Sequence, residues 1–299
     1  MIRNRRTDIL MALALIAPFL AIYGLIFVYP TIQMFKLSFT DAPLIVNSAV
    51  KQPSFVGIDN YTRLPNDPRF RVAAWNTAYF VLMTVIPGTI IALLISLGVS
   101  RLKGRFQAAV LALFFLPYIL PVSVVYLIWD WLMNFQFGIS MHLLDLFGID
   151  RVPVFKMKGT FMPMVAFVTI WWTCGFSILL FLAGIRAIPA EIYEAAALDN
   201  ASRWRTFRSI TWPLLWPVTS LVLTIQMISQ LKIFDQVYLF SQGGRPNDNM
   251  VLVYYIFQKA FQSDKGGQAA AAAVALFVVV IIVSVLQFQL LKLAGGRRT

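Results

Sequence analysis

Long apolar stretches separated by shorter polar segments run the whole length of this chain. Six of them are about 20 residues or longer, enough for a helix to cross a bilayer; they cover 9–29, 75–99, 108–133, 161–185, 214–232 and 268–291. Prolines 18, 87, 117 and 121 fall inside these stretches, where neighbouring helices can satisfy the carbonyl groups that a proline leaves free. The pattern predicts an all-α integral membrane protein with six transmembrane helices, forming a single transmembrane domain over residues 1–299.

The composition supports a membrane protein. Hydrophobic residues make up 59% of the chain and charged residues 13%, and the mean hydropathy is +0.75, far from the balance of a soluble domain. The first apolar stretch is too long for a signal peptide and lacks a clear small-residue cleavage site, so we interpret it as a retained first helix. The single cysteine, Cys174, excludes a disulfide scaffold and a cysteine metal cluster.

The distribution of basic residues predicts the orientation. With the N-terminus in the cytoplasm, the inner segments hold 13 of the 25 lysines and arginines and four of the 13 acids, a net charge of +9, which leaves +3 outside. The inner segments are short and basic beside the helix ends, whereas the outer ones are long and mixed, which favours cytoplasmic N- and C-termini. The basic pI of 10.0 is therefore a topology signal, and no basic stripe interleaved with aromatics predicts nucleic-acid binding.

One polar segment between apolar stretches holds the only two glutamates of the chain, Glu191 and Glu194. Pro189 suits the first turn of a helix, acids favour a helix N-terminus, and alanines 195–197 propagate the helix at low cost. We therefore expect a short helix over residues 189–198.

A second helical stretch should follow the first. Ser202 can cap it, and it carries arginines 203, 205 and 208. Pro213 can then open the next membrane helix. The sequence thus predicts a helix–turn–helix elbow over residues 189–213; the alternative is a solvated basic loop resting on anionic lipid.

The spacing within this elbow resembles a known signature. Glu194-Ala195-Ala196, three residues, Asn200, nine residues, Ile210, one residue and Trp212-Pro213 resembles the EAA loop in the transmembrane subunits of bacterial binding-protein-dependent ABC importers. Asn200 stands where that signature has Gly, and Asn is the next most tolerant residue in a left-handed turn. Trp212 stands where it has Leu, and Trp is enriched at membrane interfaces. We call residues 189–213 the EAA-like loop.

Two predicted outer segments extend the resemblance over the chain. The phrase at 55–61, FVGIDNY, and that at 234–246, FDQVYLFSQGGRP, are similar to phrases of the carbohydrate-uptake branch, although a Gly-Gly-x-Pro sequence also simply makes a turn. Together with the EAA-like loop they identify the chain as resembling the first-type subunit of a sugar permease pair.

The resemblance implies a bacterial inner-membrane heterodimer with a second permease subunit, two ATPase subunits that hold ATP and Mg, and an extracytoplasmic solute-binding protein that delivers a carbohydrate. It also implies a set of ATPase-coupling residues: Glu191, Glu194, Ala195, Ala196, Asp199, Asn200 and Arg203. The sequence has no phosphate loop ending in Gly-Lys-Ser/Thr, so we expect no cofactor in this chain, no catalytic residue and no enzymatic activity of its own.

The fifth apolar stretch carries three polar residues, Gln226, Ser229 and Gln230, at offsets that share one helix face. Polar groups inside lipid must face protein or water, and amides suit sugar hydroxyls because they both donate and accept. These residues are candidates for substrate binding; the alternative is interhelical hydrogen bonding that holds the bundle together.

A carboxylate and two tryptophans, Asp130, Trp171 and Trp172, are further substrate-binding candidates, because aromatic faces pack on sugar rings while a carboxylate accepts from hydroxyls. Trp129 and Trp131, which flank Asp130, fit better an aromatic belt at the interface. Small residues at 266–273 give the last helix a face on which another helix can pack closely, including one from a partner subunit.

The rival hypothesis is a secondary transporter or channel that is not driven by ATP. It predicts ionisable relays inside the membrane or inverted repeats. Neither is evident: Asp130 and Asp235 lie near predicted outer helix ends, and His142 is the only histidine. The sequence therefore favours the importer subunit.

Overall fold

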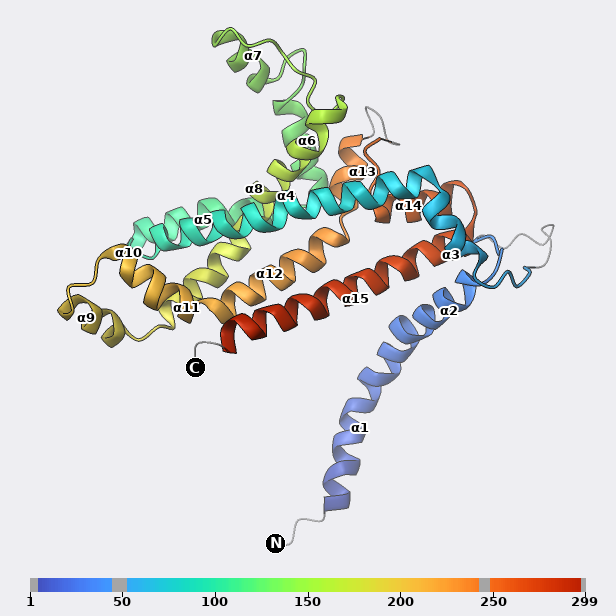
Figure 1. The fold of residues 1–299 in the computed structure, drawn as a ribbon, viewed down its shortest axis with the longest axis horizontal. Coiled ribbons are helices and arrows are strands. Elements are labelled where there is room, and N and C mark those ends of the chain that lie inside the picture. The colour runs from blue at the N-terminus through green and yellow to red at the C-terminus, as the bar shows by residue number, and fades with distance from the viewer. Residues whose placement is uncertain (1–4, 45–52, 242–247, 297–299) are drawn as a thin grey trace. The chain divides into compact units, whose positions relative to one another are not determined.

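A computed structural model describes residues 5–44, 53–241 and 248–296. These residues are almost entirely helical, as predicted, and within these ranges the only β-pairing is an isolated bridge between Thr40 and Phe55 (Figure 1). The Gly-Gly-Arg-Pro end of the 234–246 phrase lies outside the described residues.

The helices follow one another in this order: α1 (Arg5–Tyr23), α2 (Tyr29–Ser38), α3 (Asp59–Arg63), α4 (Pro68–Val99), α5 (Gly104–Ile119), α6 (Val122–Leu132), α7 (Ile139–Leu146), α8 (Lys158–Arg186), α9 (Ala190–Leu198), α10 (Arg203–Thr206), α11 (Trp212–Leu214), α12 (Trp216–Leu231), α13 (Asp235–Ser241), α14 (Leu252–Phe257) and α15 (Gly266–Gly296). Short helices of other types complete the series: π-helices η1 (Gly24–Val28), η3 (Phe207–Thr211) and η4 (Gln258–Gln262), and the 3-10 helix η2 (Leu64–Asn66).

Four helical segments are long and apolar enough to cross a membrane: Leu13–Ser38, Pro68–Val99, Gly159–Arg186 and Gly266–Leu291. Two bent pairs bring the number of candidate spans to six if each pair crosses once. The first span continues to Ser38, nine residues beyond the expected end, because α1, η1 and α2 form one uninterrupted helix.

The third predicted span is not one straight helix. α5 and α6 meet at a bend of 102°, and Figure 1 shows α6 turning away from the line of α5. Proline disfavours helical geometry in the residue before it, and Leu120, which precedes Pro121, is extended with ψ 137°. The indole of Trp172 donates to the Leu120 carbonyl at 3.1 Å, so a neighbouring helix satisfies a carbonyl at the break.

The fifth predicted span begins later than expected. Pro213 lies in the short helix α11 rather than opening the span, and α12 starts at Trp216 with Pro217 in its first turn. The segments Arg203–Leu214 and Trp216–Leu231 are bent by 64°. A proline cannot supply the N–H that would continue the preceding turn, and with Pro217 in its first turn α12 starts two residues after the expected position 214.

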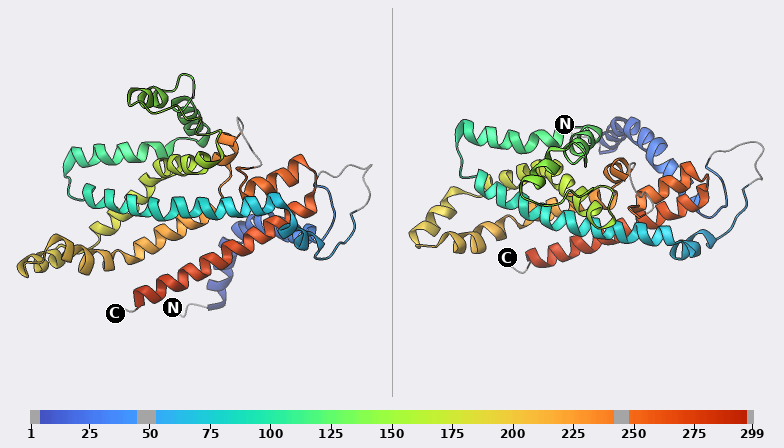
Figure 2. Two further views of the ribbon diagram at one scale, coloured as in Figure 1. Left: turned by 45° about the horizontal axis from the view of Figure 1, so that its top comes forward. Right: turned by 90° about the horizontal axis from the view of Figure 1, so that it is seen from above.

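The chain divides into two compact units. The larger, Pro68–Tyr254 with Val278–Thr299, packs α4 against α8, α5 against α8 and α12 against α4 (Figure 2). Its core cluster contains Leu93, Cys174, Phe181, Leu215 and Val222. Gly175 lets α8 approach α5 closely, because a Cβ there would lie 2.2 Å from the Phe114 carbonyl oxygen.

The smaller unit comprises Met1–Asp67 and Tyr255–Phe277. Within it, residues 38–44, 53–67 and 255–268 form what we call the clasp. The Asn60 amide donates to the carbonyls of Ser38 and Thr40 at 2.9 and 2.8 Å, and the Gly267 N–H donates to the Ala42 carbonyl at 2.9 Å. A Cβ at Gly267 would lie 1.9 Å from the Thr40 carbonyl oxygen. The small residues at the start of α15 were expected to pack against another helix. In the structure, Gly266 and Gly267 pack against the backbone of this chain's own first loop.

An ion-paired cluster also holds the clasp. The Tyr255 hydroxyl donates to the Asp67 carboxylate at 2.9 Å, and the Lys259 amine lies 2.9 Å from the same oxygen. Lys259 also lies 5.2 Å from the centre of the Tyr255 ring, within the range of a cation–π interaction. Both charged side chains are largely buried, at 14% and 22% exposed.

Candidate functional site

The first half of the EAA-like loop folds as the sequence predicts. α9 covers Ala190–Leu198, with Pro189 as its N-cap and Glu191 in its first turn. Figure 1 shows α9 and α10 forming an elbow beyond the ends of α8 and α12.

α9 has two distinct faces. Ala196 is buried and Tyr193 is half-buried, with its hydroxyl 3.2 Å from that of Thr211. Glu191, Glu194, Ala195 and Leu198 are all exposed, and their offsets of 0, 3, 4 and 7 place them on one helix face. Leu198 is 85% exposed. The sequence interpretation missed Leu198, although its spacing from Glu191 could have signalled it.

The turn after α9 confirms the reading of Asn200. Its φ is 49°, the left-handed region that Gly or Asn adopts most readily. The N–H of Asn200 donates to the Ala197 carbonyl at 3.1 Å and that of Ala201 to the Ala196 carbonyl at 2.9 Å. This pair of bonds is the Schellman motif, which satisfies carbonyls at a helix end. Asp199 is the C-cap residue.

The second half of the loop also has the predicted cap. The Ser202 hydroxyl accepts from the Arg205 N–H at 3.3 Å, which begins α10 at Arg203. Arg203, Arg205 and Arg208 are exposed. The elbow is therefore an ordered structure in which a closed turn ends α9 and a side-chain cap begins α10, and it presents one exposed helix face and three exposed arginines. The assignment of its residues to ATPase coupling stays a prediction.

The polar stripe of α12 is divided. Gln226 and Gln230 are buried, whereas Ser229 is exposed. The Gln226 amide donates to the Ser177 hydroxyl of α8 at 3.2 Å, which gives the interhelical alternative a concrete contact within this chain. Substrate binding by these three residues stays a prediction.

The two tryptophans of α8 lie in different surroundings. Trp172 is engaged at the break between α5 and α6, as described above, whereas Trp171 packs edge-on against Trp129 at 5.3 Å between ring centres. The Trp129 indole nitrogen is buried and has no hydrogen-bond partner among the residues that the structure describes. Trp129 is half-buried in these aromatic contacts and Trp131 is 56% exposed, so their assignment to an aromatic belt stays a prediction.

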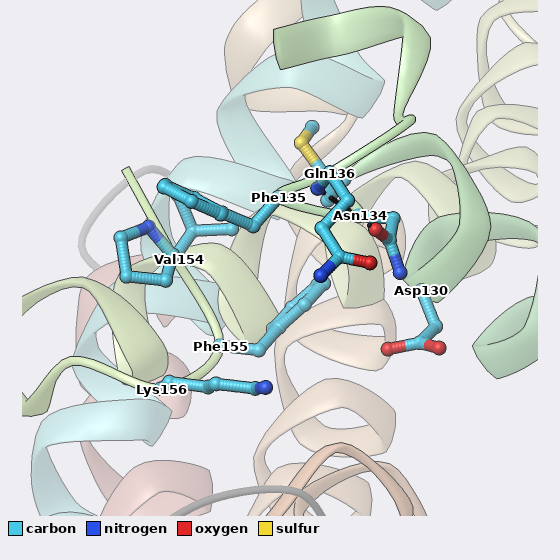
Figure 3. Close-up of a pocket in the computed structure, with 9 residues that line it drawn as sticks. Asp130, Asn134, Phe135, Gln136, Val154, Phe155 and Lys156 are labelled. Carbon is cyan, nitrogen blue, oxygen red and sulfur yellow. Dashed lines mark hydrogen bonds between the residues drawn. The ribbon is translucent and has the colours of Figure 1, made fainter. Parts of the chain in front are cut away.

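Asp130 lines a cavity of 310 Å³ between the end of α6 and the segment before α8. Figure 3 shows the Asp130 carboxylate and the Lys156 amine extending from these two segments toward the same space, with the Phe155 ring beside it. Asn134, Phe135 and Gln136 also line it. The lining thus combines a carboxylate, an amine, amides and aromatic faces, a set that suits a polyol. Sequence reasoning found only Asp130, because the other members lie up to 26 residues further along the chain.

Arg151 fixes the wall of this cavity. Its guanidinium donates to the carbonyls of Phe135 and Gln136 at 3.3 and 3.0 Å and to the Asp145 carboxylate. The hydrogen bond from Arg151, reinforced by its positive charge, lowers the pKa of Asp145 below its usual value. The lone histidine, His142, is 3.3 Å from the same guanidinium. In the described part of the chain, no group of three His, Cys, Asp or Glu side chains could hold a metal ion.

Comparison with protein families gives one match over most of the chain. The family described as "Binding-protein-dependent transport system inner membrane component" matches residues 88–292. This range includes the whole EAA-like loop, α12 and most of α15.

Curated relatives are similar over nearly the whole length. The sulfoquinovosyl glycerol transport system permease protein SmoG of Agrobacterium fabrum is 33% identical over 84% of this chain and 80% of its own. The inner membrane ABC transporter permease protein YcjO of Escherichia coli is 30% identical over 98% of both. The arabinooligosaccharides transport system permease protein AraP of Bacillus subtilis is 32% identical over 93% of this chain and 87% of its own.

The fold is also similar to a solved one. A chain in the crystal structure of a bacterial ABC transporter that imports the acidic polysaccharide alginate superposes with a TM-score of 0.83, covering 97% of this chain and 99% of that one at 24% identity. At this level of identity the match supports the fold alone.

Proposed function

The chain belongs to the family of inner membrane components of binding-protein-dependent transport systems, and from that membership we propose that it carries a sugar or sugar-like polyol into the cytoplasm as one transmembrane subunit of an ATP-driven importer. Its place is the bacterial inner membrane. Membership favours an ABC importer over a secondary transporter or channel. The proposal adds cytoplasmic termini, a second permease subunit, two ATPase subunits that bind ATP and Mg, and an extracytoplasmic binding protein.

The substrate class rests on relatives and on chemistry. The names of two relatives specify carbohydrate derivatives, sulfoquinovosyl glycerol and arabinooligosaccharides. The cavity beside Asp130 offers hydrogen-bond donors, hydrogen-bond acceptors and aromatic faces. A sugar ring needs all three, because it carries hydroxyl groups as well as C–H surfaces. We propose that the substrate passes this cavity and the amides of Gln226 and Gln230.

The free face of α9 is the observation that carries the coupling proposal. Two carboxylates, one alanine and one exposed leucine lie on a helix that is held to the body of the protein by its opposite face. Protein interfaces combine an apolar centre with a polar rim, and this face offers both kinds of group. We propose that this face docks into an ATPase subunit, with Asp199, Asn200 and Arg203 completing the contact.

The construction of the elbow suits a lever. The N-cap of Ser202 and the Schellman turn at Asn200 fix the angle between α9 and α10, so a displacement of α9 is transmitted to η3, α11 and α12. When ATP closes the ATPase dimer, the bundle would switch between inward-open and outward-open states. The two-state element is the bundle, and the elbow biases its equilibrium.

Charge reversal in the free face tests this proposal. Glu194→Lys should leave the chain inserted and abundant, because exposed substitutions change stability by less than about 0.5 kcal/mol. Loss of a charged contact at an interface costs about 2 kcal/mol or more. We therefore expect the co-expressed ATPase to be lost on affinity purification of the mutant chain, together with ATP hydrolysis by the purified complex.

A matched control distinguishes the loss of ATPase docking from a general effect of the altered net charge. Asp150→Lys makes the same kind of change at an exposed acid outside the elbow and should retain both the ATPase and its activity. Leu198→Asp should reproduce the loss without removing a charge. Normal co-purification of the ATPase with both Glu194→Lys and Leu198→Asp would show that the elbow is only a connector.

A further inference from the structure

Four aromatic rings run in an unbroken row from the start of α12 into the EAA-like loop. The centres of neighbouring rings are 6.0 Å apart for Trp216 and Trp212, 6.2 Å for Trp212 and Phe207, and 5.7 Å for Phe207 and Trp204. The Trp216 indole donates to the Leu291 carbonyl of α15 at 2.8 Å. One end of the row is thus anchored in the bundle, while Trp204 at the other end is 67% exposed.

The π-helix η3 assembles the middle of this row. In an α-helix, residues five apart point about 140° away from each other, since each residue turns the helix by about 100°. The wider turn of η3 bonds the Trp212 N–H to the Phe207 carbonyl, which places Phe207 and Trp212 one above the other. Both also pack against the core cluster of the larger unit. Such wide turns recur at functional sites because they disturb an otherwise regular helix.

The row borders a surface cavity, which we call the notch. It measures 370 Å³ and is lined by Trp204, Phe207, Arg208 and Trp212. Arg208 is exposed, and no ion pair involves it among the described residues. Trp204 and Phe207 also line a second cavity of 590 Å³, to which Arg101 and Arg203 contribute two more arginines. A cationic and aromatic surface therefore lies only a few residues before a membrane-spanning helix.

We propose that the notch binds the headgroup of an anionic phospholipid. A guanidinium matches the geometry of a phosphate and can donate two hydrogen bonds to it. Indole rings prefer the membrane–water interface, where their apolar body and polar N–H are both satisfied. The position of the notch, next to Trp216 where α12 begins, favours a lipid over a soluble partner. α9 presents a separate exposed face for the ATPase, and none of the residues that line the notch belongs to that proposed contact.

Reconstitution of the full importer complex into phosphatidylcholine vesicles with increasing fractions of phosphatidylglycerol tests this inference. Bound phosphatidylglycerol is counted by native mass spectrometry, and ATP hydrolysis is followed in parallel. Arg208→Gln should raise the phosphatidylglycerol fraction needed for half occupancy by about fivefold, the factor that corresponds to ~1 kcal/mol per basic residue at an anionic surface. Trp204→Leu should shift it in the same direction. Arg105→Gln, at an exposed arginine outside the notch, should not.

The remaining arms separate the possible occupants. Inorganic phosphate added to pure phosphatidylcholine vesicles should not reproduce the effect that phosphatidylglycerol has on ATP hydrolysis. If phosphate reproduced that effect in full, the notch would hold a free anion and the lipid proposal would be overturned. Loss of the ATPase from Arg208→Gln with unchanged lipid occupancy would make the notch a protein contact and also overturn the proposal. Arg208→Lys keeps the charge and carries the test if Arg208→Gln fails to fold: it should bind the lipid more weakly than wild type, and unchanged occupancy there would refute the guanidinium contact.

Discussion

The EAA-like loop and the clasp show two ways of ordering a segment outside the long helices. The contacts that define the loop join residues that are close in sequence: Ser202 to Arg205, Ala196 to Ala201, and Tyr193 to Thr211. The clasp instead joins residues about 200 positions apart, such as Leu44 to Asp264 and Tyr255 to Asp67. The turn between α9 and α10 is therefore determined locally, although Phe207 and Trp212 further along the loop pack on the core cluster. The clasp depends on the folded chain.

This difference predicts how each region fails. A local structure can open and close by itself, at a free energy far below that of global unfolding. A structure built from distant segments is lost when those segments separate, so its defects should appear in the stability of the whole unit. Substitutions in the clasp should therefore lower the thermal unfolding midpoint, whereas substitutions in the turn between α9 and α10 should change only local hydrogen exchange. The energetic effects in the clasp should also be the larger ones.

The largest effect is expected at Gly267. In Gly267→Ala the new Cβ would meet the Thr40 carbonyl oxygen at 1.9 Å, and since that oxygen belongs to the backbone, the first loop must move. Overpacking of this kind costs about 1–3 kcal/mol or more, so the thermal unfolding midpoint in detergent should fall clearly.

The same substitution at Gly98, inside α4, is the control. A Cβ there meets nothing within 4 Å, and alanine is favoured over glycine inside a helix by about 0.5–1 kcal/mol. The two variants should therefore move the midpoint in opposite directions. A midpoint for Gly267→Ala at or above that of the wild type would contradict the close approach in the clasp.

An intermediate effect is expected at Asp67. Asp67→Asn keeps the shape but removes the charge that pairs with Lys259 in a largely buried setting, and bonds to charged groups contribute about 1.5–3 kcal/mol. Asp59→Asn is the control, because its partner Arg63 and Asp59 itself are 65% and 59% exposed, and such surface pairs contribute about 0–1 kcal/mol.

A double-mutant cycle sharpens the result for the clasp. If the pair acts directly, Lys259→Gln should add less to Asp67→Asn than it costs alone, because the interaction is already lost. Full additivity of the two free energies of unfolding would mean that each residue acts through other contacts.

The sequence predicted the conformation of the EAA-like loop more fully than the contacts of the clasp, for physical reasons. Caps and left-handed turns depend on neighbouring residues, so Ser202 and Asn200 could be assigned their conformations from spacing alone. The sequence correctly marked Gly266 and Gly267 as positions that another segment can approach closely. It does not identify that segment, Thr40–Leu44, because only the fold brings these residues together. Lys156 and Phe155 escaped notice beside Asp130 for the same reason.

Breaks in the long helices were the other feature that the sequence located only in part. Pro121 and Pro213 were both noted, yet hydropathy alone does not distinguish a tolerated proline from one that bends the chain by 102°. Pro87 and Pro163 lie inside long helices that remain continuous. The difference at Leu120 is its extended backbone together with the Trp172 indole, which donates to the Leu120 carbonyl. That contact spans 52 residues.

The smallest effect is expected at Asn200, and it should be visible only locally. Asn200→Gly retains access to the φ of 49° and should leave the loop unchanged. Asn200→Ala places a β-carbon in the left-handed region at a cost of about 1–2 kcal/mol, which weakens the turn that joins α9 to α10. Hydrogen exchange of peptides covering 190–205 should then speed up about fivefold or more in the alanine variant, while the thermal midpoint of the whole chain stays near that of the wild type. If Asn200→Ala instead lowered the global midpoint as much as Gly267→Ala, the loop would be part of the cooperative core, and the distinction between a locally determined lever and a clasp built from distant segments would be wrong.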